Sequence, residues 1–354
     1  MINIGDRIVG DGAPCFITFE AGPTIDSLET GKQLISHAAE AGVDAIKFQI
    51  VDPDRLLADK DQSITYGILL DRETEETEEI TESVYDIMCR RVLSKDEWHE
   101  LKRHSDSLGL AFFATALFEE DLNLITDLKC NSIKIASADV DHLTFIKAAA
   151  QTGLCLQLDT GNSTLGEIET AIDLIQGEGN NQIIIHQCPS GYPAYLPSIN
   201  LNMIKTLKQM FSYPVAYSDH SPGATMDIAA VAMGANLVEK TISLDRTTRS
   251  AEHMFSIEPP EMSGFIQTIR DVETAMGSSR RIFPSEEREK RVSGRRSIFI
   301  RRDLPAGHKL AMSDIDFRRP GDGIAASKTD MLLNKPLLRD IKRDHKLEWS
   351  DVQQ

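Results

Sequence analysis

The sequence predicts an α/β protein whose main domain is a TIM barrel, a ring of eight parallel strands surrounded by helices. Short apolar runs alternate with longer runs of helical periodicity, and the alternation repeats eight times between Phe16 and Gly277. Eight βα units in a segment of this length match the size and rhythm of that fold. An open, doubly wound sheet is the competing arrangement, but eight regular repeats favour the barrel.

The eight predicted strands are short apolar runs, each followed along the chain by a helix. The strands span residues 16–20, 45–49, 111–115, 132–135, 155–159, 183–187, 215–218 and 237–240. The helices span residues 27–41, 94–108, 119–128, 142–152, 164–176, 202–211, 224–233 and 260–276.

Two segments depart from this rhythm. Residues 49–91 are too long for an ordinary βα loop and are strongly acidic between 71 and 82. A long ordered excursion on a barrel rim usually covers the active site, although a solvated charged loop is the alternative. After Met276 the repeats stop, so we expect a barrel domain over 1–280, a polar linker over 281–294 and a small domain over 295–354. Such a small domain has a thin core, and we expect contact with another surface to stabilise it.

Composition excludes several classes of protein. Hydrophobic residues at 41% and charged residues at 26% are ordinary for a globular chain. There is no apolar run of membrane-spanning length and no basic, apolar leader, so we expect a cytoplasmic protein. The five cysteines are scattered and never form a CxxC pair, which argues against structural zinc and a disulfide framework. A net charge of −17 argues against nucleic-acid and membrane partners.

Polar side chains gather at the carboxyl ends of the predicted strands, where barrel enzymes bind their ligands. Lys47 and Lys134 are costly inside a barrel unless each ammonium meets an anion. With hydroxyls from Thr115 and Ser137, and with Lys240 as a third lysine, they predict a phosphate site. A Schiff-base lysine, as in class I aldolases, is the alternative.

The other candidates are carboxylates and histidines at the same rim. Glu20 ends the first strand and is a candidate base or hydroxyl-binding group. His220, in the run Tyr217-Ser218-Asp219-His220, is a candidate metal ligand, acid or base. His186 and His253 lie where they could face the same cavity.

Taken together, these phrases resemble the sialic acid (N-acetylneuraminate) synthase family over nearly the whole chain. The phrases are Ala41-Gly42-Val43-Asp44-Ala45-Ile46-Lys47-Phe48-Gln49, Lys134-Ile135-Ala136-Ser137, Ser190-Gly191-Tyr192-Pro193-Ala194, Tyr217-Ser218-Asp219-His220, Glu239-Lys240 and Arg319-Pro320-Gly321-Asp322-Gly323-Ile324. The resemblance implies a TIM barrel followed by a C-terminal antifreeze-like (SAF) domain. It also implies condensation of phosphoenolpyruvate (PEP) with an N-acylated hexose such as N-acetylmannosamine, giving a nonulosonic acid.

The resemblance assigns roles residue by residue. PEP would be held by Lys47, Thr115, Lys134, Ser137 and Ser218, and the amino-sugar by Glu20, Gln49, Tyr192 and Glu252. Asp139 stands where the family has an acidic residue that handles a proton or water. Family members are typically homodimers in which each SAF domain caps the partner's barrel, so Arg319 would reach the sugar in trans.

The chain departs from the family pattern mainly around the sugar and the metal. The family holds a divalent metal, Mn²⁺ or Mg²⁺, with two histidines, and here the second position is Thr241 while the first is His220. We expect a substitute ligand such as His253 or His186, a weakly bound hard ion, or no metal. Gly191 and Asp322 are further departures, as is the run Gly22-Pro23-Thr24-Ile25-Asp26. The alternative function is therefore a divergent barrel that binds sugar or PEP with little catalysis and acts as a regulatory or interaction protein.

Overall fold

The computed structural model describes residues 1–353 of the 354-residue chain. Its contacts divide the chain into two compact units, Met1–Gly277 and Ser278–Gln354. No helix in the described part is both long and apolar enough to cross a membrane.

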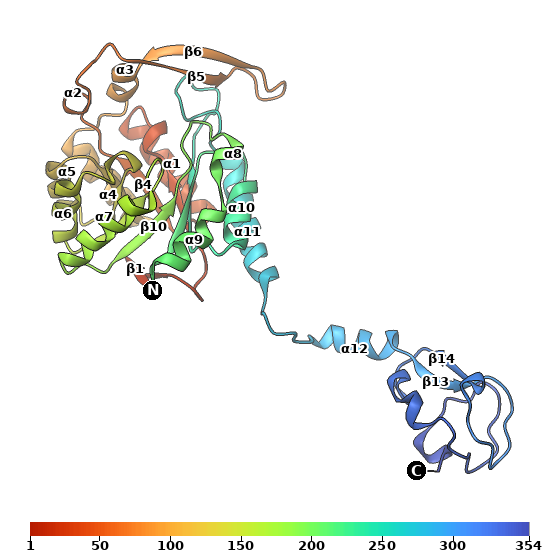
Figure 1. The fold of residues 1–354 in the computed structure, drawn as a ribbon. Coiled ribbons are helices and arrows are strands. Elements are labelled where there is room, and N and C mark those ends of the chain that lie inside the picture. Colours follow the sequence, from red (N-terminus) through yellow and green to blue (C-terminus); the bar gives the residue numbers. More distant parts are fainter. Residues whose placement is uncertain (354) are drawn as a thin grey trace. The chain divides into compact units, whose positions relative to one another are not determined.

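The first unit is a closed barrel of eight parallel strands, which confirms the predicted TIM barrel (Figure 1). Around the ring the strands follow their order along the chain: β3 (Phe16–Glu20), β4 (Ala45–Gln49), β7 (Ala111–Ala116), β8 (Ser132–Ile135), β9 (Cys155–Asp159), β10 (Ile183–Gln187), β11 (Val215–Asp219) and β12 (Leu237–Thr241). Each coincides with a predicted strand to within one residue at either end.

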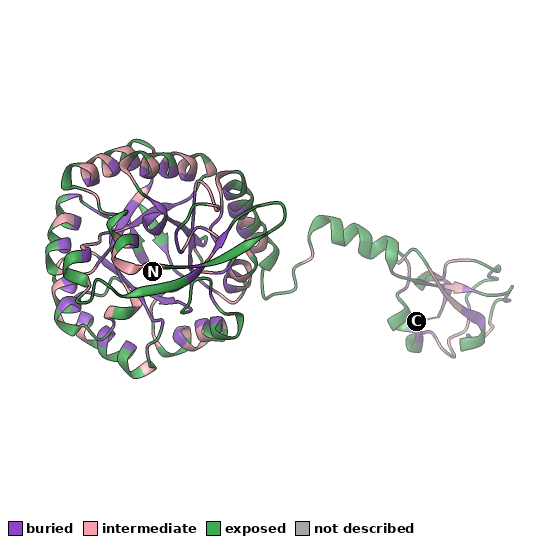
Figure 2. Cartoon of the chain, turned by 90° about the horizontal axis from the view of Figure 1, so that it is seen from above, coloured by how far each residue is buried: buried purple, intermediate pink, exposed green. Residues whose placement is uncertain are grey.

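The eight predicted helices are present and surround the barrel, as the view from above shows (Figure 2). They are α1 (Leu28–Ala41), α4 (Lys95–Ser107), α5 (Glu119–Asp127), α6 (Leu143–Gln151), α7 (Leu165–Gly177), α9 (Asn202–Met210), α10 (Thr225–Ala232) and α11 (Pro259–Met276). A short extra helix, α8 (Leu196–Ile199), follows β10. Side-chain caps start several of them: Ser94 and Thr164 each form a capping box with a glutamate, which satisfies amide groups that the first helical turn leaves free.

A hairpin at the N-terminus closes one end of the barrel, and the sequence patterns did not reveal it. Strands β1 (Ile2–Ile4) and β2 (Arg7–Val9) pair in antiparallel fashion. Their side chains Ile2, Ile4 and Val9 are buried against the first interior residues of the barrel strands. Because apolar side chains fill this end, ligands can enter the barrel only from the opposite end, where the strands finish.

The long excursion after β4 is ordered and lies across the open end. It contains α2 (Pro53–Leu56), the antiparallel pair β5 (Ser63–Leu69) and β6 (Thr77–Ser83), and α3 (Val84–Cys89). Figure 2 shows the hairpin crossing the barrel mouth. Tyr66, Ile68, Ile80 and Ile87 pack on Ala251, which belongs to the segment between β12 and α11. Arg72 reinforces this contact by donating to Asp245 (2.7 Å) and Glu258 (2.8 Å).

The second unit has its own small apolar core. Strands β13 (Ser297–Ile300) and β14 (Ile315–Arg318) pair in antiparallel fashion, and short 3-10 turns supply most of the remaining regular structure. Buried side chains from the whole segment 298–352 form one cluster. Helix α12 (Ser285–Gly294) lies where we expected a polar linker, and none of its residues is buried.

This unit also contains an internal sequence repeat whose two copies form the same hydrogen bonds. The residues Arg302-Asp303-Leu304, His308-Lys309-Leu310 and Ser313-Asp314-Ile315 recur in the same order and spacing as Arg339-Asp340-Ile341, His345-Lys346-Leu347 and Ser350-Asp351-Val352. In each copy the last aspartate is completely buried and accepts hydrogen bonds from the arginine and the histidine of its own copy. These paired charges hold together loops that have little regular structure of their own.

Candidate active site

The barrel interior changes from apolar to polar along the strands. Alternate residues of a barrel strand face inward. At the closed end the inward residues are Phe16, Ala45, Phe113, Cys155, Ile184, Ala216 and Leu237. Two positions further along the same strands, the residues are Thr18, Lys47, Thr115, Gln157, His186, Ser218 and Glu239, all of them buried. The polar layer therefore lies between an apolar floor and the open mouth.

Glu239 is the centre of this polar layer. Its carboxylate accepts hydrogen bonds from Lys47 Nζ (2.8 Å), Lys134 Nζ (2.7 Å) and Ser218 Oγ (3.1 Å). Lys47 also pairs with Glu20, and Lys134 pairs with Asp159 at 3.0 Å. Two buried ammonium groups thus share three carboxylates, which offsets the cost of removing each charge from water.

His186 takes part in the same network but is fully engaged by it. Its Nδ1 lies 3.3 Å from Lys134 Nζ, and its Nε2 lies 3.0 Å from Oε1 of Gln157. Gln157 in turn donates to Ser132 Oγ at 2.6 Å. With both ring nitrogens occupied, His186 has no free lone pair for a metal ion in this arrangement.

Burial and neighbouring charges shift the pKa values in this network in opposite directions. Burial alone would raise the pKa of Glu239, but Lys134 and Lys47 hold it well below its usual range. Burial raises the pKa of Glu20 and of Asp159, more than their lysine partners lower it. Burial disfavours the charged form of Lys47, but Glu20 and Glu239 outweigh it and raise the pKa above the usual value. A lysine held as ammonium is a poor nucleophile, which argues against the Schiff-base alternative at Lys47.

Lys240 is not part of this network, so its inclusion among the phosphate-binding lysines was wrong. It follows the inward-facing Glu239 and therefore points out of the barrel, where it pairs with Asp219 and, at 3.5 Å, with Asp227 of α10. Asp219 also accepts a hydrogen bond from Tyr217 at 2.8 Å. Of the run Tyr217-Ser218-Asp219-His220, only Ser218 and His220 remain as candidates for ligand contact.

Glu20 and Gln49 lie together at the ends of β3 and β4. Glu20 is 4% exposed and accepts a hydrogen bond from the amide of Gly22 at 2.6 Å. A side chain at Gly22 would meet the amide nitrogen of Gln49 at 2.6 Å and Glu20 at 2.7 Å. Glycine is required at this position because the backbone turns tightly against both residues.

His220 lies at the mouth and forms a cluster with two aromatic rings. Its ring centroid is 4.5 Å from that of Tyr192 and 6.2 Å from that of Phe255. Nδ1 lies 3.2 Å from the carbonyl oxygen of Pro189, an arrangement in which Nδ1 carries the proton and Nε2 is free to accept. Burial lowers the pKa of His220 to about 4, so the ring is neutral at pH 7.

The residues present do not form a protein-held site for a transition metal. Thr241 follows Lys240, the register partner of Asp219, so it lies beside His220 at the neighbouring strand end. A threonine hydroxyl is a much weaker ligand than imidazole. His253 is buried and its Nδ1 is 2.7 Å from Ser243 Oγ. Within residues 1–353 no group of three His, Cys, Asp or Glu side chains is arranged to hold a metal ion.

The remaining barrel candidates line the rim around the network. Thr115 lies beside Gln49 on one side and Lys134 on the other in the strand register. Ser137 Oγ accepts the amide of Gly161 at 3.0 Å and so joins the loops after β8 and β9. Asp139 is half-buried, and burial raises its pKa.

Two further candidates come from later segments. Glu252 lies between β12 and α11, on the segment that the excursion covers, and burial raises its pKa to about 7. Arg319 belongs to the second unit, directly after β14, and is exposed there.

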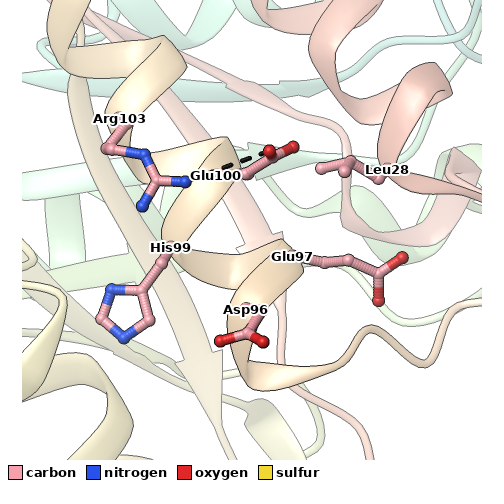
Figure 3. Close-up of a pocket in the computed structure, with 6 residues that line it drawn as sticks. All are labelled: Leu28, Asp96, Glu97, His99, Glu100 and Arg103. Atoms are coloured by element: carbon pink, nitrogen blue, oxygen red, sulfur yellow. Dashed lines mark ion pairs between the residues drawn. The ribbon is translucent and has the colours of Figure 1, made fainter.

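A hollow on the outside of the barrel has different chemistry. It lies between the start of α1 and one side of α4 and is lined by Leu28, Asp96, Glu97, His99, Glu100 and Arg103 (Figure 3). Its polar residues are exposed or partly exposed and mostly acidic, and the one ion pair drawn there, Arg103 with Glu100, spans 4.0 Å. None of the predicted site residues lines it.

Sequence reasoning gave no role in the site to two central members of the network: Glu239, which was named only within the phrase Glu239-Lys240, and Asp159. Both could have been found by counting alternate positions inward from the apolar floor: Leu237, Glu239 and Thr241 on β12, and Cys155, Gln157 and Asp159 on β9.

Comparison with known proteins agrees with this geometry. An uncharacterized protein of Methanocaldococcus jannaschii is 33% identical over 352 residues, covering 99% of this chain and 98% of its own. The N,N'-diacetyllegionaminic acid synthase of Legionella pneumophila is 31% identical, covering 97% and 96%. Among solved structures, the N-acetylneuraminic acid synthetase of Leptospira borgpetersenii has a TM-score of 0.71 at 29% identity, covering 82% of this chain and 94% of its own.

The spore coat polysaccharide biosynthesis protein SpsE of Bacillus subtilis has a TM-score of 0.65 at 28% identity, with 99% of each chain covered. Residues 295–353 match the SAF domain, in agreement with the C-terminal part of the resemblance. Residues 34–281, more than half of the sequence, match the NeuB family. The chain therefore belongs to the NeuB family of PEP-condensing synthases, and it is an enzyme of that class.

Proposed function

We propose that this enzyme condenses PEP with an N-acyl hexose, N-acetylmannosamine or a modified deoxy-hexose relative, and releases a nonulosonic acid and phosphate. The observation that carries the proposal is the pair of buried lysines, Lys47 and Lys134, joined by Glu239 beneath the open mouth of the barrel. Two ammonium groups at this depth suit a small, highly charged substrate better than a neutral one.

The proposed reaction uses the charge of this layer to fix PEP. Lys47, Lys134, Thr115, Ser137 and Ser218 hold its phosphate and carboxylate. C3 of PEP then attacks the aldehyde carbon, water adds to C2, and phosphate leaves with cleavage of its bond to that carbon. Positioning of the two substrates supplies much of the catalysis in this scheme.

The acceptor is proposed to bind nearer the mouth. Glu20 and Gln49 from adjacent strand ends, with Tyr192 and Glu252, contact its hydroxyl groups, and Asp139 handles the proton or the water. His220 is neutral at pH 7 and acts as a hydrogen-bond acceptor. NeuB enzymes generally use a divalent metal, Mn²⁺ or Mg²⁺, but the donor set here does not fit one, and we assign it no step.

We propose a homodimer in which Arg319 of one chain reaches the acceptor in the barrel of the other. The residues of the second unit include more lysine and arginine than aspartate and glutamate, whereas the whole chain carries −17. Opposite charge on the two units favours docking of one on the other. Sedimentation of the intact chain tests the dimer, and mixing Arg319→Ala with a barrel-inactivated variant tests the contribution in trans, because activity should return only in the mixture.

Phosphate release from PEP, measured with a panel of N-acyl hexoses and with or without Mn²⁺, tests the reaction. Release that depends on one acceptor supports it. The alternative, a barrel that binds PEP or sugar with little catalysis, is favoured by Thr241, and no group of three or more His, Cys, Asp or Glu side chains within residues 1–353 could hold a metal ion. Measurable PEP binding without release for any acceptor would establish that alternative.

A further inference from the structure

Lys134 is sealed from solvent by its own counter-ions. Its side chain has no exposed surface, and its ammonium is held by Glu239 at 2.7 Å and by Asp159 at 3.0 Å. A phosphate or carboxylate entering from the mouth cannot reach this ammonium while both carboxylates stay in place.

The two counter-ions are held very differently. Glu239 is anchored by three donors, Lys47, Lys134 and Ser218. Asp159 Oδ1 is buried and has no hydrogen-bond partner among residues 1–353, apart from its ion pair with Lys134 and a 3.6 Å approach to Nδ1 of His186. The Asp159 side chain is 12% exposed, against 5% for Glu239, so it is the one on the open side.

We propose that Asp159 is an internal counter-ion that occupies, on Lys134, the place of a substrate oxyanion, so that PEP binds by displacing it. This inference rests on the proposed function, because it takes Lys134 to be a PEP-binding residue. Asp159 is the last residue of β9, at the strand end that faces the mouth. The proposed exchange therefore requires a rotation of this side chain and no change in the strand order of the barrel.

The exchange explains how a buried lysine stays paired in both states. Leaving an ammonium buried and unpaired is costly, so an enzyme that empties its site after each turnover needs a replacement anion there. Asp159 supplies it when no substrate is bound. The cost is weaker substrate binding, because each ligand must compete with a tethered carboxylate.

The competition also selects the class of ligand. A monocarboxylate offers Lys134 only what Asp159 already provides, and it enters a layer where three carboxylates face two ammonium groups. A phosphate ester carries more charge and more acceptor oxygens than a carboxylate. The site should therefore prefer PEP over pyruvate and over lactate, which have the carboxylate alone.

Titration calorimetry with PEP on the intact chain tests the proposal. Asp159→Asn keeps the shape and removes the charge, and we expect PEP to bind about tenfold to a hundredfold more tightly, the value of a charge-assisted hydrogen bond. Asp159→Ser, a smaller neutral residue, should shift the affinity in the same direction. The affinity for pyruvate should increase by a larger factor than the affinity for PEP in either variant.

Asp44→Asn is the matched control. Asp44 is also a buried carboxylate of the barrel, but it accepts from the amide of Ile17 and pairs with Arg270 just before β4 begins, at the closed end. Loss of the Asp44 charge changes the net charge of the protein by the same amount. PEP affinity should stay within about twofold of wild type, because a charge far from the binding site is largely screened.

PEP binding that is unchanged or weaker in both Asp159 variants, with Asp44→Asn like wild type, would overturn the proposal and leave the proposed function intact. If no form binds PEP, the proposed function fails, and inorganic phosphate then serves as the probe. Tighter phosphate binding by the Asp159 variants would still support the counter-ion role, and equal binding would refute it.

Discussion

Replacing Glu239 with glutamine should destabilise the barrel far more than a Glu-to-Gln change usually does. Glutamine can accept from one lysine, but its amide group then turns two donor hydrogens toward the other ammonium. Breaking a buried ion pair from one side costs about 3–5 kcal/mol. Lys47 and Lys134 keep Glu20 and Asp159, so the lower end, about 3 kcal/mol, applies here.

Thermal unfolding measured by calorimetry checks this value. For a domain of this size each kcal/mol shifts Tm by about 2–4 °C, so we expect Tm to fall by roughly 6–12 °C. Glu100→Gln is the matched control: its partner Lys32 lies at 2.7 Å, but both side chains are about a third exposed or more. Its unfolding free energy should change by less than about 1 kcal/mol.

A Glu239→Gln variant that unfolded within about 1 °C of wild type would show that the network contributes no net stability. A similar fall in the Tm of the Glu100→Gln control would mean that burial is not what distinguishes the two carboxylates.

Three further predictions concern the metal, the acceptor and the second unit. Thr241→His should tighten Mn²⁺ binding by placing a second imidazole beside His220, and unchanged affinity by calorimetry would mean that the two positions do not converge. Because burial raises the pKa of Glu252 to about 7, kcat/KM for the acceptor should rise with pH through that value, and Glu252→Gln should remove the dependence. Burial alone would raise the pKa of Asp314, but hydrogen bonds from His308, the Ala311 amide and Arg302 lower it to about 2. The ionised Asp314 therefore contributes its full stability to the folded unit above its unfolded pKa near 3.8, and this contribution is lost as pH falls toward 2. The hydrogen-exchange protection factors of the second unit, which correct for the intrinsic pH dependence of exchange, should therefore fall in that acid range. Asp314→Asn should lower them at pH 7, with Asp351→Asn as the matched change in the other copy of the repeat.

The barrel was predictable because its signals are local. Apolar strands and amphipathic helices each need only a few neighbouring residues to be recognised, and their strict alternation leaves few possible architectures. The N-terminal hairpin was missed because its strands are three residues each and its apolar residues are buried only once the barrel exists.

The site was only partly predictable because charge does not reveal which way a side chain points. Lys134 and Lys240 have similar positions in the sequence of their strands. Lys134 points into the barrel and pairs with Glu239, whereas Lys240 points outward and pairs with Asp227 of α10. Glu239 on β12 accepts hydrogen bonds from side chains of β4, β8 and β11, and only closure of the barrel brings these strands close enough for that. The register of a strand, counted in steps of two from its apolar end, would have separated these cases.

In the proposed reaction PEP is consumed by condensation, with cleavage of its carbon–oxygen bond rather than its phosphorus–oxygen bond. The most direct measurement is phosphate release in ¹⁸O-labelled water, with and without an N-acyl hexose. We expect release only with the acceptor, and phosphate free of ¹⁸O, because water adds to C2. Labelled phosphate, or release without any acceptor, would contradict this reaction.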